Sequence, residues 1–298
     1  MTFLYTLLWI KITWKGYFMM KKVSKKIGSV LFCLLPVLLA FGIQLAVSIP
    51  AVLLKSTSLL EKHPEYFSDL DSFQSAITNA VSGDFSVWIS VIYAVIAGLI
   101  MCFWYWKRFV PKKVPKRKLS QIINWKMFFG LLFLIVGMQY IASYLVVLIN
   151  LIHPAWYDTY TSIMETAGFS DISPLLAVYS VIIAPISEEL IFRGVTMHYA
   201  KRIMPFWVAN ILQAFLFGAF HGNVVQGTYA FVIGLFCGYV CNRGGSIYLS
   251  ILFHMLFNAW GTLLPSFYMS FYLMLPITVL AVWIGFYLYN KGRTNQYD

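Results

Sequence analysis

Residues 174–197 read PLLAVYSVIIAPISEELIFRGVTM, a stretch of mostly apolar side chains that also contains Glu188, Glu189 and Arg193. A helix of this length can cross a hydrocarbon core of about 30 Å. Because a charged group near the centre of a bilayer costs about 2.5–3.5 kcal/mol on insertion scales, two adjacent carboxylates need a reason. Glu189 and Arg193 are four residues apart and can pair on one helix face, whereas Glu188 is rotated by about 100°. These charges are therefore either a buried ion network that only fixes packing or part of a reactive site.

The composition of the whole chain is that of a membrane protein. Of the 298 residues, 60% are apolar and only 11% are charged, and the mean hydropathy is +0.75. Soluble domains carry about 25% charged residues. We therefore expect an all-α polytopic membrane protein with about eight transmembrane helices. These helices are predicted at roughly 28–54, 84–106, 126–152, 174–197, 205–222, 227–242, 246–263 and 267–290.

The segments between these stretches contain no Gly/Ser linker, repeat or low-complexity tract, which indicates a single polytopic membrane domain over residues 20–298. Met20 begins the sequence MKKVSKKIGSV, a typical basic start just before a first transmembrane helix. Residues 1–19 are therefore interpreted as a start-site extension. The loop over about 55–83 is polar enough for a small external helix.

The charged residues outside the membrane predict an orientation. If eight spans alternate, nearly all of the 22 Lys and Arg lie on one side, and eight of the 11 Asp and Glu lie on the other. Because Lys and Arg near helix ends favour the cytoplasmic side, both termini are predicted to be cytoplasmic. The net charge of +11 then sets orientation, and no nucleic-acid partner is expected. The short basic side, without an organelle signal, favours a bacterial plasma membrane.

Two further apolar stretches each contain a histidine. His221 lies in FLFGAFHGN, four residues after Phe217, and His254 lies in ILFHMLFNAWG, four residues before Asn258. Glu188 beside a neutral imidazole could take a proton from water, and His254 and Asn258 are donors suited to an oxyanion on a peptide carbonyl. Together these groups would hydrolyse an amide bond without a covalent intermediate. Alternatively, Glu188, His221 and His254 could hold a zinc ion with an open position for water.

The motifs of several other membrane enzymes are missing from the sequence. There is no HExxH, no GxSxG around a membrane serine and no P-loop, and the Gly83-Asp84 and Tyr157-Asp158 pairs lie at the outer boundary. A zincin, a rhomboid-like serine protease, an intramembrane aspartyl protease and ATP-driven transport are therefore disfavoured. The four cysteines indicate no disulfide framework, although Cys237 and Cys241, four residues apart, could bind a metal.

Three motifs on successive spans together resemble one known family: Glu188-Glu189-x-x-x-Arg193, Phe217-x-x-x-His221 and His254-x-x-x-Asn258. This is the CAAX prenyl-protease and bacteriocin-processing (CPBP, also called Abi) family of intramembrane proteases. The resemblance covers roughly residues 174–262, and no motif position departs from the family pattern. It implies an eight-helix endopeptidase with its site in a cavity inside the bilayer. Eukaryotic members cleave a prenylated C-terminal CAAX peptide, and bacterial relatives are linked to bacteriocin maturation, self-immunity and peptide-pheromone processing.

The resemblance also implies a role for each motif residue. Glu188 and His221 would activate the water, and His254 with Asn258 would stabilise the oxyanion. Glu189, Arg193 and Phe217 would support this site structurally. The family is commonly labelled a metalloprotease, but a metal-free glutamate mechanism fits the same residues, so we expect no required cofactor, with Zn²⁺ as the alternative. The expected partners are a peptide or protein substrate with a membrane-embedded or lipid-anchored segment, and membrane lipids.

Two other functions are compatible with the sequence. One is a non-catalytic membrane scaffold or immunity factor that regulates a partner membrane protein. The other is a proton-coupled transporter that uses Glu188 and the histidines as a relay, although the sequence has no evident inverted repeats. The predicted boundaries also contain a geometric conflict: at 1.5 Å per residue, His221 lies about 24 Å from the start of its span, deeper than Glu188 and His254 near mid-membrane. A shared site requires a different position for the fifth helix.

Overall fold

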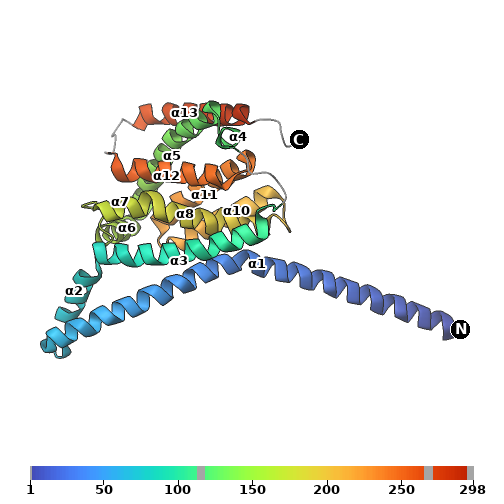
Figure 1. Ribbon diagram of the computed structural model, residues 1–298, viewed down its shortest axis with the longest axis horizontal. Helices are drawn as coiled ribbons and strands as arrows, with labels where there is room; N and C mark the ends of the chain where they lie inside the picture. The colour runs from blue at the N-terminus through green and yellow to red at the C-terminus, as the bar shows by residue number, and fades with distance from the viewer. Residues whose placement is uncertain (1, 113–117, 265–270, 294–298) are drawn as a thin grey trace.

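The computed structural model describes residues 2–112, 118–264 and 271–293, and the regular structure of this part of the chain is entirely helical (Figure 1). The prediction of an all-α polytopic membrane protein is confirmed. Six helical segments are long and apolar enough to cross a membrane, and each overlaps a predicted span. They are Val30–Lys62, Asp84–Phe109, Trp125–Ile152, Pro174–Ala200, Val224–Gly244 and Tyr272–Gly292.

The first half of the chain contains the long N-terminal helix, two further apolar helices and four short elements. These are α1 (Thr2–Lys62), η1 (Pro64–Phe67), α2 (Leu70–Val81), α3 (Asp84–Phe109), α4 (Leu119–Ile122), α5 (Trp125–Ile152) and α6 (Pro154–Thr166). The N-terminal part of α1 projects away from the other helices (Figure 1). α2 is the external helix expected between residues 55 and 83. Asp69 caps it by accepting the Ser72 N–H, and the side-chain and backbone hydrogen bonds from Ser72 lower the pKa of Asp69.

α6 lies where the sequence predicted only an outer loop. Pro154 occupies its first turn, where a missing N–H is harmless and the fixed φ favours a helix. The ring of Tyr160 packs edge-on against Tyr229 of the later helix α11, with 6.5 Å between the ring centroids. α6 is therefore held by contacts with the helix core as well as by its own sequence.

The second half of the chain contains the motif residues. Its elements are α7 (Pro174–Val178), η2 (Tyr179–Ile183), α8 (Ala184–Glu189), η3 (Leu190–Thr196), α9 (Met197–Ala200), α10 (Phe206–Phe220), α11 (Val224–Gly244), α12 (Ile247–Leu263) and α13 (Phe271–Gly292). α7 to α9 follow one another without a break and correspond to the single span predicted at 174–197.

α10 and α12 are shorter than the other apolar helices, with 15 and 17 residues. At 1.5 Å per residue, α10 is about 22 Å long, which is less than the thickness of a hydrocarbon core. The sequence predicted stretches of nearly these lengths, at 205–222 and 246–263. α10 ends at Phe220, with His221 as its C-cap, so His221 lies at the end of a helix shorter than a full span. α10 begins one residue from its predicted start, so the distance from that start to His221 is nearly the predicted one.

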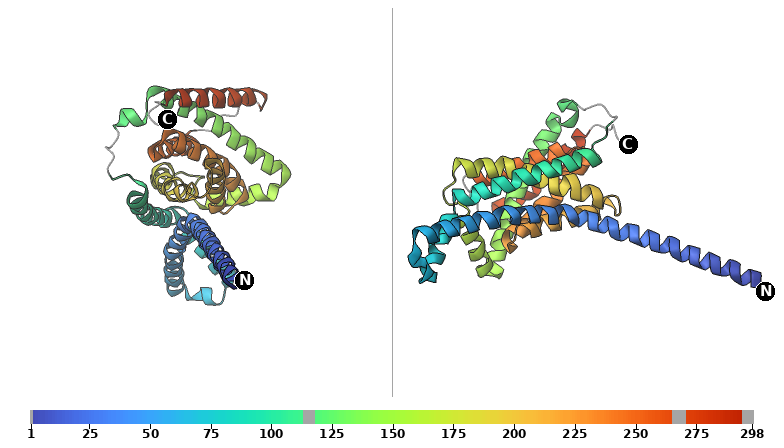
Figure 2. Two further views of the ribbon diagram at one scale, coloured as in Figure 1. Left: turned by 90° about the vertical axis from the view of Figure 1, so that its right-hand side faces the viewer. Right: turned by 60° about the horizontal axis from the view of Figure 1, so that its bottom comes forward.

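The helices pack around two hydrophobic clusters. One joins α1, α3, η3, α9 and α10, and the other joins α5, α11, α12 and α13. α8, α10, α11 and α12 lie between the α1–α3 side and the α5–α13 side (Figures 1 and 2). α5 and α13 approach each other closely at Gly130, because a Cβ there would lie only 2.6 Å from the Tyr289 backbone nitrogen. The motif residues therefore sit in the middle layer of the molecule.

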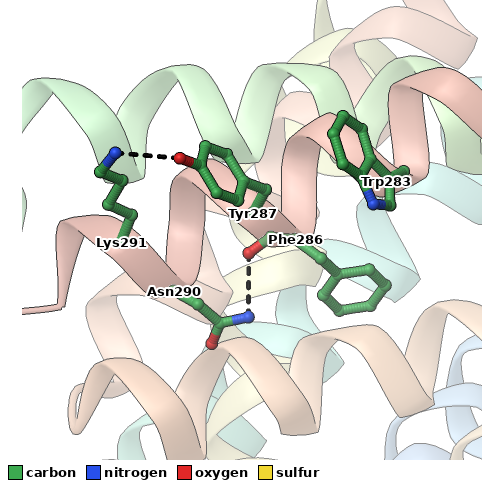
Figure 3. A pocket seen from close by; sticks show the side chains of 5 residues that line it. All are labelled: Trp283, Phe286, Tyr287, Asn290 and Lys291. Atoms are coloured by element: carbon green, nitrogen blue, oxygen red, sulfur yellow. Dashed lines mark hydrogen bonds between the residues drawn. The ribbon is translucent and has the colours of Figure 1, made fainter.

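α13 also carries a surface pocket next to α5 (Figure 3). It is lined by Trp283, Phe286, Tyr287, Asn290 and Lys291. None of these residues belongs to the motifs identified in the sequence, so this pocket is separate from the candidate site.

Candidate active site

The segment that carries the glutamate pair is an α-helix with two π-helical parts, η2 and η3. In η2, the Ala184 N–H bonds to the Tyr179 carbonyl, five residues back. Pro185 has no N–H, so neither of these two backbone positions is left to donate to the Ser180 carbonyl. The side chain of Asn258 supplies this bond, with 2.8 Å between Asn258 Nδ2 and Ser180 O. Asn258 therefore connects α12 to η2, the π-helical part that precedes the two glutamates.

The second π-helical part follows the glutamates directly. The Met197 N–H bonds to the Phe192 carbonyl, again five residues back. π-helical turns inside α-helices are rare and are frequent at functional sites. Since one lies before α8 and one after it, Glu188 and Glu189 occupy a short α-helical segment whose rotation differs from that of a regular helix.

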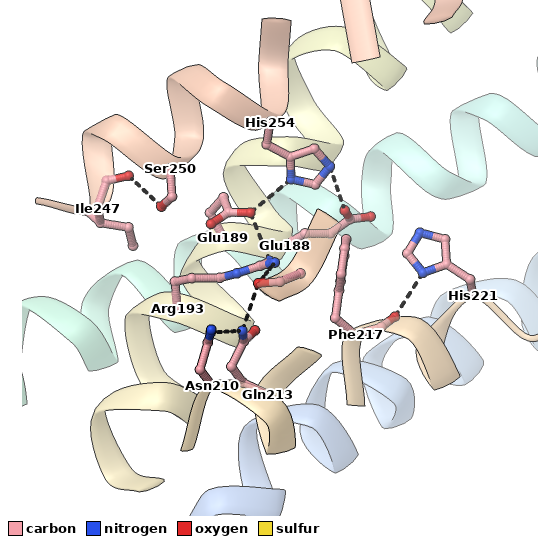
Figure 4. A network of polar contacts seen from close by, with 11 residues as sticks. Glu188, Glu189, Arg193, Asn210, Gln213, Phe217, His221, Ile247, Ser250 and His254 are labelled. Carbon is pink, nitrogen blue, oxygen red and sulfur yellow. Dashed lines mark hydrogen bonds and ion pairs between the residues drawn. The ribbon is translucent and has the colours of Figure 1, made fainter. Parts of the chain in front are cut away.

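Glu189 is the centre of a fully buried ion network (Figure 4). Its Oε1 lies 2.8 Å from Arg193 Nη1 and 2.9 Å from His254 Nδ1, and the side chains of Glu189 and Arg193 are 0% exposed. Arg193 also donates from Nη2 to the Gly234 carbonyl of α11, at 3.2 Å. A buried carboxylate needs such partners, because an isolated charge in a low-dielectric interior is very costly. The i, i+4 pairing of Glu189 with Arg193 follows the sequence prediction.

Glu188 points elsewhere and is the accessible member of the pair. Its side chain is 20% exposed, and its Oε2 lies 3.6 Å from His254 Nε2. In Figure 4 the Glu188 carboxylate lies between the rings of His254 and His221. His221 Nδ1 bonds to the Phe217 carbonyl at 2.8 Å, so the Nε2 edge of this ring is left for another partner.

The ring of Phe217 holds these groups together. It meets the ring of His221 edge-on at 4.9 Å and that of His254 at 5.6 Å, between centroids. The guanidinium carbon of Arg193 lies 4.6 Å from the centroid of the same ring, which is a cation–π contact. Phe217, which was predicted to support the site, thus contacts residues of all three motifs.

A second polar layer lies behind the ion network. Asn210 and Gln213 of α10 are fully buried, and they bond to the Leu235 and Gly234 carbonyls of α11 at 3.0 and 2.9 Å. Neither residue was among those predicted from the sequence. They could have been found from the sequence, because two polar amides stand out in an otherwise apolar helix and their i, i+3 spacing places them on one face.

We expect Gly238→Ala to disrupt this layer, because a Cβ at residue 238 would collide with Asn210 Oδ1 and lie 2.8 Å from Gln213 Nε2. Overpacking a dense interior costs about 1–3 kcal/mol. The measurement is thermal unfolding in detergent, with Gly42→Ala as the control, since a Cβ there meets nothing within 4 Å. Equal unfolding temperatures for Gly238→Ala and the control would contradict the packing described for α10 and α11.

The structure also tests which residues fit a metal. Among the described residues, the set of three whose ligand atoms lie within 4.8 Å of one another is Glu189, Cys237 and His254. The predicted zinc set of Glu188, His221 and His254 is not gathered this closely. The Glu189 set is a poor metal site as well, because a cation there would sit beside the Arg193 guanidinium, 2.8 Å from Glu189. Neither set fits a metal in this arrangement.

The comparison with protein families agrees with the position of this cluster. Residues 170–260 match the family model described as Type II CAAX prenyl endopeptidase Rce1-like. No curated protein and no solved structure matches the chain. The matched region contains every motif residue, from Glu188 to Asn258. Residues 170–260 are therefore similar to the Rce1-like endopeptidases, and this is the resemblance that the three motifs predicted.

Proposed function

We propose that this chain is an intramembrane endopeptidase that hydrolyses a peptide bond in a membrane-associated or exported peptide. The observation that carries the proposal is the unequal treatment of the two adjacent glutamates. Glu189 is fully buried and bonded to Arg193 and His254, whereas the Glu188 side chain is 20% exposed and faces the imidazoles. A structural ion network alone would not require the second carboxylate to be accessible.

In the proposed reaction, a water between Glu188 and His221 gives a proton to the Glu188 carboxylate as its oxygen attacks the carbonyl carbon. The electron pair of the C=O bond moves to the oxygen, which becomes an oxyanion. When the C–N bond breaks, its electrons go to the nitrogen, which takes the proton from Glu188. The oxyanion re-forms the C=O bond as the C–N bond breaks. The products are an amine and a carboxylic acid, the proton of the acid passes to the amine to give an ammonium and a carboxylate, and the site returns to its starting state.

The buried network gives His254 a defined orientation. Its Nδ1 must carry a proton, because its partner at 2.9 Å is the carboxylate of Glu189. For His254 to donate to an oxyanion from Nε2, that nitrogen must carry a proton too. The two carboxylates would then be balanced by Arg193 and by the His254 imidazolium. Asn258 uses one N–H for the Ser180 carbonyl and has a second N–H for the substrate.

We propose that the reaction needs no metal, because the donor atoms of Glu188, His221 and His254 are not gathered as a metal site. Incubation with EDTA, followed by its removal, should leave the cleavage rate unchanged. A zinc protease treated in parallel, which should lose activity, is the control, and metal content is measured on the same samples. Loss of cleavage that Zn²⁺ restores would contradict the metal-free mechanism.

The substrate class is proposed from the family alone: a prenylated peptide, a bacteriocin or pheromone precursor, or a protein involved in self-immunity. The charge asymmetry supports a plasma-membrane enzyme with cytoplasmic termini. Comparative peptidomics of cells with wild type and with Glu188→Gln tests the function. Peptides that accumulate uncleaved only in the variant identify the substrate. Identical peptidomes, together with a wild-type phenotype of the variant, would instead favour the scaffold or immunity factor.

A further inference from the structure

A buried tyrosine beside the candidate site has a hydroxyl without a partner. Tyr93 of α3 is 7% exposed, and its Oη is buried with no hydrogen-bond partner among the described residues. Buried polar groups are nearly always hydrogen-bonded, and leaving one unsatisfied costs about 1–3 kcal/mol. A buried phenol without an acceptor therefore calls for a ligand or a water at this position.

A ring contact and the packing of α3 on α8 place Tyr93 beside the candidate site. Its ring packs against Phe220, the residue before His221, with 6.4 Å between the centroids. α3 packs directly on α8 here, since a Cβ on Gly98 would lie 3.6 Å from Ser187 Cβ. Tyr93 thus approaches the same space as Glu188 and His221, from a helix outside the three motifs.

Each of the two donors expected for the oxyanion already has one acceptor within the protein, so each has at most one N–H left for the substrate. Asn258 donates to Ser180, and Nδ1 of His254 faces Glu189. The phenol of Tyr93 is a donor that no described residue accepts from. It becomes useful when a carbonyl oxygen enters the site and gains negative charge.

Resting on the endopeptidase activity proposed above, we infer that Tyr93 is a further catalytic residue that donates a hydrogen bond to the carbonyl oxygen of the scissile peptide bond. This bond strengthens as the oxygen becomes an oxyanion, while the proton stays on the phenol. The phenol therefore stabilises the transition state more than the bound substrate, and the water and Glu188 carry out the proton transfers.

The test is Tyr93→Phe, which keeps the ring against Phe220 and removes only the hydroxyl. We expect kcat for a peptide identified by peptidomics to fall by about 10²-fold, as for the loss of one oxyanion donor, with KM unchanged. The unfolding temperature should stay the same or rise, because the hydroxyl has no protein partner to lose.

Tyr289→Phe is the matched control. Tyr289 is also buried, but its hydroxyl donates to the Val240 carbonyl at 2.8 Å, in the hydrophobic cluster of α5 and α13. This variant should unfold at a lower temperature and keep the kcat of the folded protein. The opposite responses of the two variants separate a catalytic hydroxyl from a structural one.

The possible failures can be distinguished. If wild type cleaves the peptide and Glu188→Gln does not, but Tyr93→Phe has the wild-type kcat, the inference about Tyr93 is wrong and the hydroxyl only holds a water. An increase in KM with unchanged kcat would also overturn it, because the hydroxyl would then bind the ground state. If wild type and Glu188→Gln are equally inactive, the proposed function fails, and the role of Tyr93 fails with it.

Discussion

Cleavage by the purified Glu188→Gln variant should be about 10³-fold slower than by wild type or slower still, within the range of about 10²–10⁴ for the loss of a general base. Glutamine has nearly the same shape as glutamate, but it cannot take a proton from water. Glu188 is the accessible carboxylate and lies outside the buried Glu189–Arg193 pair, so folding should be little affected. The measurement is kcat in detergent or vesicles, with the unfolding temperature as a check.

Glu165→Gln is the matched control, because Glu165 is an exposed carboxylate of α6 outside the three motifs. It should cleave at the wild-type rate. Activity of Glu188→Gln within a few-fold of wild type would contradict the proposed role of Glu188 as the general base. A variant that is inactive but unfolded would point to the ion-network alternative, in which the glutamates only fix packing.

The positions of the apolar helices could be predicted from the sequence, since a continuous apolar run has few alternatives in a membrane protein. The pairing of Glu189 with Arg193 could be predicted too, because i, i+4 geometry is local. The ends of α10 and α12 could be predicted closely as well, since Phe206–Phe220 and Ile247–Leu263 nearly match the predicted stretches 205–222 and 246–263. The position of His221 beside Glu188 and His254 could not, because it depends on how separate helices pack.

The remaining parts of the site depend on contacts between distant segments. The bond from Asn258 to Ser180 requires both the π-helical turn before Pro185 and the register of α12. Tyr93 is one of 19 tyrosines, and no periodicity distinguishes it. Only the burial of its hydroxyl and the packing of α3 on α8 distinguish Tyr93 from the other tyrosines. Motifs indicated the groups that carry charge, whereas the neutral donors around them had to be found in three dimensions.

Breaking the buried ion network should have the largest effect on stability. Arg193→Met removes the guanidinium that lies 2.8 Å from Glu189, and both side chains are 0% exposed. Removing one partner of a buried ion pair costs about 3–5 kcal/mol, since the other charge is left uncompensated. Arg193→Met also loses the contact with the ring of Phe217 and the bond to the Gly234 carbonyl. We therefore expect a large fall in unfolding temperature in detergent.

Two further variants separate charge from packing. Arg202→Met is the same substitution at an exposed arginine that also contacts aromatic rings, Phe109 and Tyr199, and it should cost about 0.5–1 kcal/mol. The double variant Glu189→Gln with Arg193→Met removes the charge left behind, so it should be more stable than Arg193→Met alone. If the double variant is less stable by the sum of the two single losses, the pair is not coupled, and the stability of Arg193 comes from packing. Recovery in the double variant would show that the uncompensated charge of Glu189, and not lost packing, destabilises Arg193→Met.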